Sequence, residues 1–131
     1  RLKTDLLKVI INAVNNKLKK TKINWRKEKC MTIVMCSKGY PGKYKKNINL
    51  KNIYKIKLSK DDFIYHAGTK LKNGNLFSNG GRVLNITSTG KKFYNIRKRI
   101  LKILKKINLK YGFYRRDIGW KVINKNANYK R

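Results

Sequence analysis

Two stretches of the chain repeat apolar side chains at helical spacing. Apolar groups three or four positions apart lie on one face of an α-helix, so residues 2–19 and 91–108 are predicted to form amphipathic helices. Lys and Arg cover the opposite face of the second stretch, as in a helix that packs on a core and meets solvent. The apolar positions are Leu2, Leu6, Ile10, Ala13, Val14 and Leu18 in the first stretch, and Phe93, Ile96, Ile100, Leu104 and Ile107 in the second.

Shorter apolar runs between these helices predict β-strands. The Asn73-Gly74 pair is typical of a tight hairpin turn, after which Leu76 and Phe77 return along a neighbouring strand. The predicted strands are 30–36, which is apolar enough to be buried, then 53–57 within a mainly irregular segment 43–60, and finally 63–69 and 83–89. Other segments lack such runs: 20–29 is predicted to be a linker, 37–42 an ordered turn, and the last eight residues a frayed end.

This order of elements predicts an α+β fold. Consecutive hairpin strands imply a mixed, largely antiparallel sheet, and the helices are expected to pack on one face of it. A length of 131 residues suits one domain, or one domain and part of a neighbour. The chain opens with Arg1 rather than Met, so we expect it to be a piece of a longer protein. No apolar run approaches 18 residues, so no membrane span is predicted.

The charge of the chain is extreme and has two explanations. Lys and Arg number 36 against 5 Asp and Glu, for a formal net charge of +31. Lys, Ile and Asn together supply 59 of the 131 residues, which is what drift toward A- and T-rich codons produces. A dedicated nucleic-acid-binding protein more often favours Arg, gathers its charge on one face and interleaves aromatic residues. We favour drift, and the alternative is a basic module that binds nucleic acid without sequence preference.

No complete set of catalytic residues is visible. The chain has a single His, His66, and only Asp117 is a candidate to meet it in space. Cys30 and Cys36 are separated by five residues, which is not the spacing of a zinc site, so we expect small buried thiols in a reducing compartment. Arg115-Arg116-Asp117 is predicted to form an ion-pair corner, with Trp120 in the core.

The best candidate for a binding site lies on either side of the predicted hairpin. Lys70 comes before the hairpin and Arg82 after it, and neighbouring strands would bring the two cations together around a phosphate. Gly80 and Gly81 let a backbone approach a ligand closely, and their N–H groups can face an anion. The structural alternative for the two glycines is a bulge or bend at the start of a strand.

Four motifs in register resemble one enzyme family. The order and spacing of these motifs make the chain similar to the C-terminal part of phosphoribosylamine–glycine ligase over roughly residues 1–123. The start of the chain also resembles the helix that follows the metal motif of that family's ATP-grasp domain. The motifs are Ser37-Lys38-Gly39-Tyr40-Pro41-Gly42, His66-Ala67-Gly68-Thr69-Lys70, Asn79-Gly80-Gly81-Arg82-Val83-Leu84 and Tyr114-Arg115-Arg116-Asp117-Ile118-Gly119-Trp120.

The resemblance implies a fold, an activity and a site. Residues 1–26 would end an ATP-grasp domain as a helix plus linker, and residues 27–131 would form the ligase C-terminal domain with a frayed tail after about 123. The complete enzyme would join glycine to 5-phosphoribosylamine with ATP and Mg²⁺, both held mainly by upstream residues. Lys70 and Arg82 would contact the substrate phosphate, with Asn79, Gly80 and Gly81 shaping the loop. We also expect a cytoplasmic monomer with neither a specific nucleic-acid partner nor a membrane partner.

Overall fold

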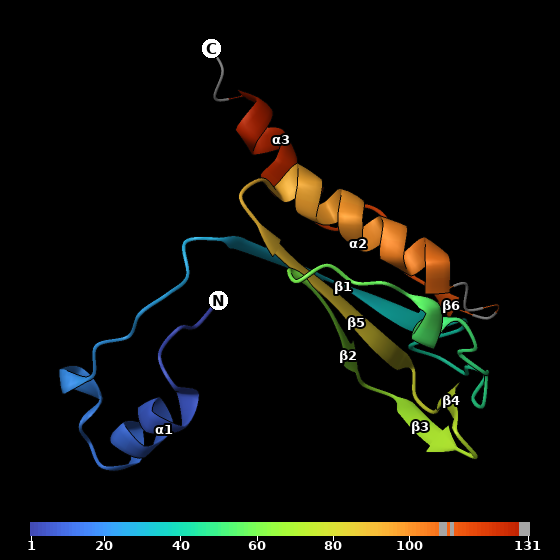
Figure 1. Ribbon diagram of the computed structural model, residues 1–131, viewed down its shortest axis with the longest axis horizontal. Coiled ribbons are helices and arrows are strands. Elements are labelled where there is room, and N and C mark those ends of the chain that lie inside the picture. The colour runs from blue at the N-terminus through green and yellow to red at the C-terminus, as the bar shows by residue number, and fades with distance from the viewer. Residues whose placement is uncertain (108–109, 111, 129–131) are drawn as a thin grey trace.

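The computed structural model describes residues 1–107, 110 and 112–128, without the side chains of residues 125–128. The chain has two parts, which we call the arm (residues 1–28) and the body (residue 29 onward). The arm carries one short helix and projects away from the body, whereas the body combines a sheet with a long covering helix (Figure 1). All four sequence motifs lie in the body.

The body is built on a four-stranded sheet in the order β2-β5-β1-β6. Every neighbouring pair in this sheet is antiparallel. The long central pair aligns Ile33 with Ile86, and both side chains are buried. The strands are β1 (Lys29–Ser37), β2 (Asp62–His66), β5 (Arg82–Gly90) and β6 (Gly112–Phe113), so the strands predicted at 30–36 and 83–89 are confirmed.

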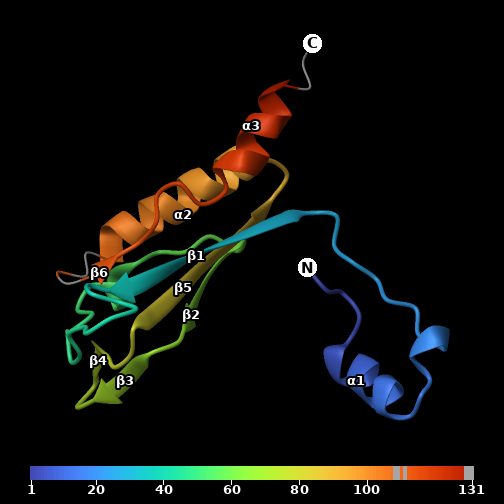
Figure 2. The same ribbon diagram turned by 180° about the vertical axis from the view of Figure 1, so that it is seen from behind.

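Helix α2 (Phe93–Ile107) lies across one face of the sheet (Figure 2). Its stripe at Ile96, Ile100, Leu104 and Ile107 is buried against the inward side chains of β1 and β5, which is the packing that its apolar spacing predicted. The α+β fold with its helix on one face is thus confirmed. Residue 108, the predicted last residue of this helix, lies outside the described residues.

Three strand-like segments at one end of the body pair with one another apart from the main sheet. β3 (Thr69–Lys72) and β4 (Asn75–Ser78) are a hairpin around Asn73-Gly74, as predicted, but they form a separate two-stranded sheet. The segment 47–50 adds to the other edge of β4, since Leu50 N–H donates to the Leu76 carbonyl at 2.8 Å. A predicted strand from 63 to 69 is therefore wrong: it divides at Ala67-Gly68 into β2 and β3.

A buried carboxylate ties the edge strand β2 to the rest of the body. Asp62 accepts hydrogen bonds from Ser59 Oγ and Ser88 Oγ, both at 2.6 Å, and from Arg99 Nε of α2 at 3.0 Å. Burial by itself would raise the pKa of Asp62, but these three donors together hold the pKa below its usual range. The ionised carboxylate thus belongs to the folded state.

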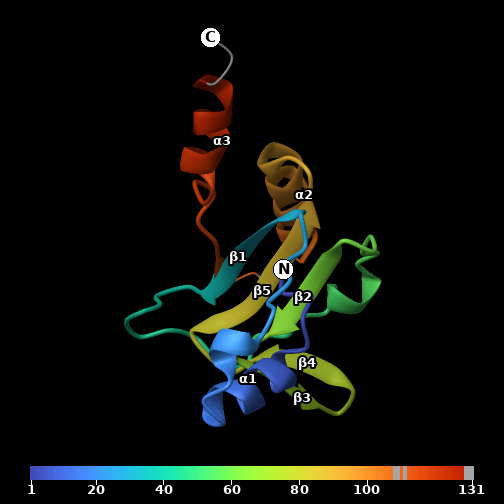
Figure 3. The same cartoon turned by 90° about the vertical axis from the view of Figure 1, so that its left-hand side faces the viewer.

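The arm folds locally but does not enter the core. Helix α1 (Leu6–Val14) begins at Asp5, whose carboxylate accepts from the Lys8 N–H at 2.9 Å. It is shorter than the predicted 2–19, because the left-handed Asn16, with φ 57°, ends it, and a 3-10 helix, η1 (Leu18–Lys20), follows. No residue of α1 is buried. Figure 3 shows the arm and α2 on opposite sides of the sheet.

Four other local predictions are wrong. The segment predicted as a strand at 53–57 forms a 3-10 helix, η2 (Ile53–Lys55), with Ile53 buried. Trp120 is 49% exposed instead of lying in the core. Trp120 is the first residue of helix α3 (Trp120–Asn128). The tail that was expected to be frayed is therefore helical as far as residue 128, and residues 129–131 lie outside the described residues. Cys30 and Cys36 are free thiols but only partly buried.

Candidate phosphate site

Three of the four motifs meet at one end of the sheet and are bonded to one another. Ser37 N–H donates to the Gly81 carbonyl at 2.8 Å, and Ser37 Oγ donates to the Gly80 carbonyl at 3.0 Å. Gly68 N–H donates to the Arg82 carbonyl at 2.8 Å, and its own carbonyl accepts from Asn79 N–H at 2.7 Å. The turn after β1, the β2–β3 connection and the β4–β5 connection thus form one framework.

The glycines of this framework are required by close packing within the protein. A Cβ on Gly68 would lie 2.5 Å from the Cα of Gly80, and a Cβ on Gly81 would lie 2.0 Å from the Tyr40 ring. Close packing between separate segments of the chain therefore explains these glycines without a ligand. Among the described residues, neither the Gly80 nor the Gly81 N–H donates a hydrogen bond to the protein.

A β-bulge sets the direction of Arg82. Along β5, Leu84 pairs with Met35 but Arg82 pairs with Cys36, so Val83 is an extra residue without a partner on β1. Val83 and Leu84 are both fully buried, whereas Arg82 is exposed. Strict alternation from Leu84 would turn Arg82 toward the core, and the extra residue returns it to the open face.

Arg82 lines an open cavity of about 420 Å³. The described part of the chain contributes no carboxylate to this lining, and no ion pair of Arg82 occurs there. Burial raises the pKa of the Cys36 thiol, and the nearby Arg82 guanidinium lowers that pKa by a smaller amount. The lining residues are Tyr40, Tyr44, Ala67, Gly68, Gly81, Arg82 and Asn85.

Lys70 borders a different cavity from Arg82. It is on β3, where it pairs with Phe77, and it borders a different cavity of about 410 Å³ together with Lys72 and Asn75. The expectation that the hairpin brings residues 70 and 82 onto neighbouring strands is wrong, because β5 pairs with β2 and β1 instead of with β3.

The other predicted residues have local partners. His66 Nδ1 lies 3.1 Å from Thr69 Oγ1, and Asp117 forms the expected ion pair with Arg115 at 2.5 Å. The described structure thus gives no His66–Asp117 pair. Sequence reasoning also missed Tyr44 and Asn85 as lining residues. Tyr44 lies just outside a motif, and Asn85 shares a face with Arg82 only because of a bulge that the residue pattern does not predict.

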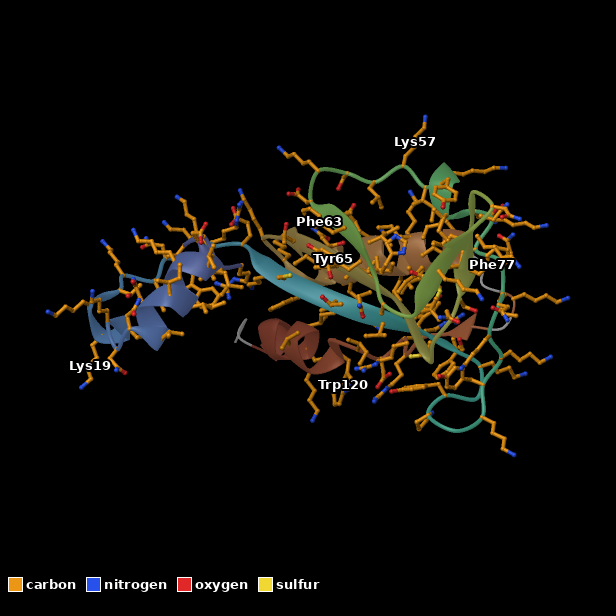
Figure 4. The ribbon with its side chains drawn as sticks, turned by 90° about the horizontal axis from the view of Figure 1, so that it is seen from below. Lys19, Lys57, Phe63, Tyr65, Phe77 and Trp120 are labelled. Carbon is orange, nitrogen blue, oxygen red and sulfur yellow. The ribbon has the colours of Figure 1, made fainter. Side chains whose placement is uncertain are left out.

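The basic side chains do not gather on one face. In Figure 4, long side chains with nitrogen tips project from the arm, where Lys19 is labelled, and from the body at the top of the view, near Lys57. Among the described residues, no three His, Cys, Asp or Glu side chains lie together in a group that could hold a metal. In the same residues, no helix is both long and apolar enough to cross a membrane.

Comparison with known proteins identifies the family of the chain. The family described as "Phosphoribosylglycinamide synthetase, C domain" matches residues 30–121. Phosphoribosylamine–glycine ligase of Agrobacterium fabrum is 41% identical over 123 residues, which are 94% of this chain and 29% of that protein. The chloroplastic ligase of Arabidopsis thaliana is 38% identical over 125 residues, covering 94% of this chain and 24% of the relative.

The fold is also found in a solved ligase. The crystal structure of phosphoribosylamine–glycine ligase from Thermotoga maritima superposes with a TM-score of 0.61 at 28% identity, covering 82% of this chain and 27% of that one. The antiparallel sheet under one long helix is thus the fold of a phosphoribosylglycinamide synthetase C domain. The chain belongs to the phosphoribosylglycinamide synthetase C-domain family. It spans less than a third of the length of these relatives.

Proposed function

We propose that the chain serves as the C-terminal part of a phosphoribosylamine–glycine ligase. That enzyme would join glycine to 5-phosphoribosylamine with ATP hydrolysis, giving glycinamide ribonucleotide in purine synthesis. The proposal is supported by the names of relatives that match 94% of the chain. The free thiols Cys30 and Cys36 suit a reducing compartment, and we place the protein in the cytoplasm.

Within that enzyme, this part would bind the phosphate of 5-phosphoribosylamine through Arg82. The observation that carries this proposal is an exposed Arg side chain, free of carboxylate partners in the described structure, on the wall of a cavity. A guanidinium holds phosphate with two parallel hydrogen bonds, and the unengaged N–H groups of Gly80 and Gly81 would add donors. Asn79 would help to shape the loop, since its N–H holds the Gly68 carbonyl.

Lys70 would be a weaker contact of the same phosphate. It follows Gly68 by two residues but borders the neighbouring cavity, and it presents a point charge without the fork of a guanidinium. Its substitution should therefore act in the same direction as that of Arg82, with a smaller effect.

The remaining chemistry would belong to other parts of the ligase. We assign residues 1–26 to the end of an ATP-grasp domain and residues 27–131 to the C-terminal domain, because the family match starts at residue 30 and α1 buries nothing here. The acidic residues described do not fit a Mg²⁺ site. We therefore expect no glycinamide ribonucleotide from the 131-residue chain alone in a coupled ADP-release assay.

Steady-state kinetics on a chimeric ligase test the proposal. In the Agrobacterium fabrum relative, the matching segment is replaced by this chain, and each substrate is varied in turn. Arg82→Ala should raise the KM for 5-phosphoribosylamine roughly ten- to a hundredfold and leave the KM for ATP unchanged, because a charge-assisted phosphate contact is lost. Lys57→Ala, which changes an exposed cation that does not line the cavity, is the matched control. Unchanged 5-phosphoribosylamine kinetics in a folded Arg82→Ala enzyme would contradict the site.

A further inference from the structure

Several polar side chains besides Arg82 border the cavity without a protein partner. The Asn85 amide is half-buried, yet no hydrogen bond of it occurs within the described residues, and the same holds for the hydroxyl groups of Tyr40 and Tyr44. Partly buried polar groups in a folded protein are normally hydrogen-bonded to protein or water. All three groups line the same hollow and are free to bond a polar ligand.

The bulge at Val83 puts Asn85 and Arg82 on the same face of β5. Asn85 pairs with Val34 on one side and with Tyr65 on the other, so all three side chains lie on the face opposite α2. Three residues of strand span about 10 Å between the two Cα atoms. Side chains of this length can reach the two ends of a pentose phosphate from such positions.

The aromatic wall of the cavity is held rigidly. The Tyr40 ring rests on Gly81, where no Cβ fits, and packs edge-on against Tyr44 with ring centroids 6.2 Å apart at 62°. Fixed aromatic rings offer a flat apolar surface with hydroxyl groups at the rim. A small polar ligand with one apolar face, such as a furanose ring, suits such a wall, and 420 Å³ is within the range of ligand pockets.

We propose that Asn85 is the residue that recognises the ribosyl hydroxyl groups of a pentose 5-phosphate whose phosphate lies on Arg82. This inference rests on the proposed function and extends it from the phosphate to the sugar. A carboxamide both donates and accepts, so it can bond two neighbouring hydroxyl groups at once, one as donor and one as acceptor. Tyr40 and Tyr44 form the wall against which the sugar ring lies.

The test is a titration of the 131-residue chain with three ligands, followed by NMR at the backbone amides of Gly81 and Asn85. The ligands are ribose 5-phosphate, 2-deoxyribose 5-phosphate and inorganic phosphate. The ratio between the two sugars reports hydroxyl recognition, because general attraction of anions to a chain of charge +31 cancels in it. The wild-type chain should bind ribose 5-phosphate about three- to tenfold more tightly than the deoxy sugar, as for one neutral hydrogen bond.

Variants separate this inference from the proposed function. Asn85→Leu, which is similar in volume, and the smaller Asn85→Ala should both abolish the preference for ribose while leaving the binding of inorganic phosphate unchanged. Arg82→Ala should weaken the binding of all three ligands, as followed at these amides, roughly ten- to a hundredfold. Asn95→Ala, an exposed amide on α2, is the control and should change nothing, and a thermal melt of each variant verifies folding.

Each outcome has a distinct meaning. A folded Asn85→Leu chain that still prefers ribose, or a wild-type chain without preference, would overturn the role of Asn85 even if Arg82 proves essential for phosphate. Site-specific phosphate binding that survives Arg82→Ala would overturn the proposed phosphate site instead. Failure of all three ligands to shift these amides at millimolar concentration would overturn both.

Discussion

The arm and the body each contain a helix with an apolar stripe, and the two stripes have opposite fates. On α1, the side chains of Leu6, Leu7, Ile10, Ile11 and Val14 are between 48% and 77% exposed. On α2, those of Ile96, Ile100, Leu104 and Ile107 are 2% exposed or less. Both sequences predict an amphipathic helix equally well. The comparison teaches that periodicity identifies a helix but not the surface that covers it.

The largest difference between the two helices should appear when each stripe loses one side chain. Leu104→Ala leaves a cavity in the core and should lower the free energy of unfolding by about 2–5 kcal/mol. Ile10→Ala removes a half-exposed side chain and should change it by no more than about 0.5 kcal/mol. Urea denaturation followed by circular dichroism measures both. Equal losses in the two variants would mean that α1 packs on the body in solution.

The next largest effect should come from the buried carboxylate of the body. Asp62→Asn removes a charge-assisted hydrogen bond to Arg99 and should lower the free energy of unfolding by about 1.5–3 kcal/mol at neutral pH. Since the pKa of folded Asp62 is depressed, its stabilisation is present above the unfolded pKa of about 3.9 and is lost as pH falls through the folded pKa. Urea denaturation at a series of pH values measures this contribution.

The pH dependence distinguishes Asp62 from its neighbour. Asp62→Asn should flatten the fall in wild-type stability below about pH 4. Asp61→Asn is the matched control, because within the described chain the Asp61 carboxylate has neither a hydrogen bond nor an ion pair. If both variants kept the wild-type pH profile, the network around Asp62 would not contribute to stability.

A smaller loss is expected where two chain segments touch at glycines. Gly68→Ala places a Cβ 2.5 Å from the Gly80 backbone, and forced overpacking of this kind costs about 1–3 kcal/mol. In Gly42→Ala the new Cβ has its nearest contact at 3.3 Å, with the Gly39 carbonyl oxygen, so stability should stay within about 1 kcal/mol of wild type. Thermal melts of the pair measure the contrast. A fully stable Gly68→Ala protein would show that the two segments can move apart.

The smallest global effect is expected in the arm. Asp5→Ala removes the N-cap of α1, which stabilises a helix by about 0.5–2 kcal/mol. Because α1 buries no residue, this loss should be local: amide hydrogen exchange in α1 should accelerate while the urea midpoint of the body stays the same. The converse control is Leu104→Ala, which should shift the midpoint. A lower midpoint in Asp5→Ala would show that the arm and the body unfold together.

Local sequence patterns predicted the helices and strands that pack in the core. The strands at 30–36 and 83–89, the hairpin at Asn73-Gly74 and the stripe of α2 are confirmed, since alternation, turn residues and helical spacing each report local geometry. The end of α1 was missed because it depends on a left-handed Asn16. Trp120 was misplaced because large apolar residues at a chain end need not reach the core.

The site was harder to predict than the fold, for physical reasons. Its residues came from the motifs, but how they lie depends on strand pairing, and hairpin logic wrongly joined Lys70 to Arg82. The extra residue at Val83 reverses the alternation of β5, so the shared face of Arg82 and Asn85 cannot be read from residue order. The glycine contacts between separate loops are likewise visible only in three dimensions.

The exposed stripe of α1 also affects the self-association of the isolated chain in solution. Its apolar side chains favour contact between molecules, while a net charge of +31 keeps the molecules apart. Salt weakens only the second effect, because the screening length falls from about 30 Å at 0.01 M to about 8 Å at 0.15 M. Clustering of this protein should therefore increase with ionic strength, and dilute buffer should keep it dispersed.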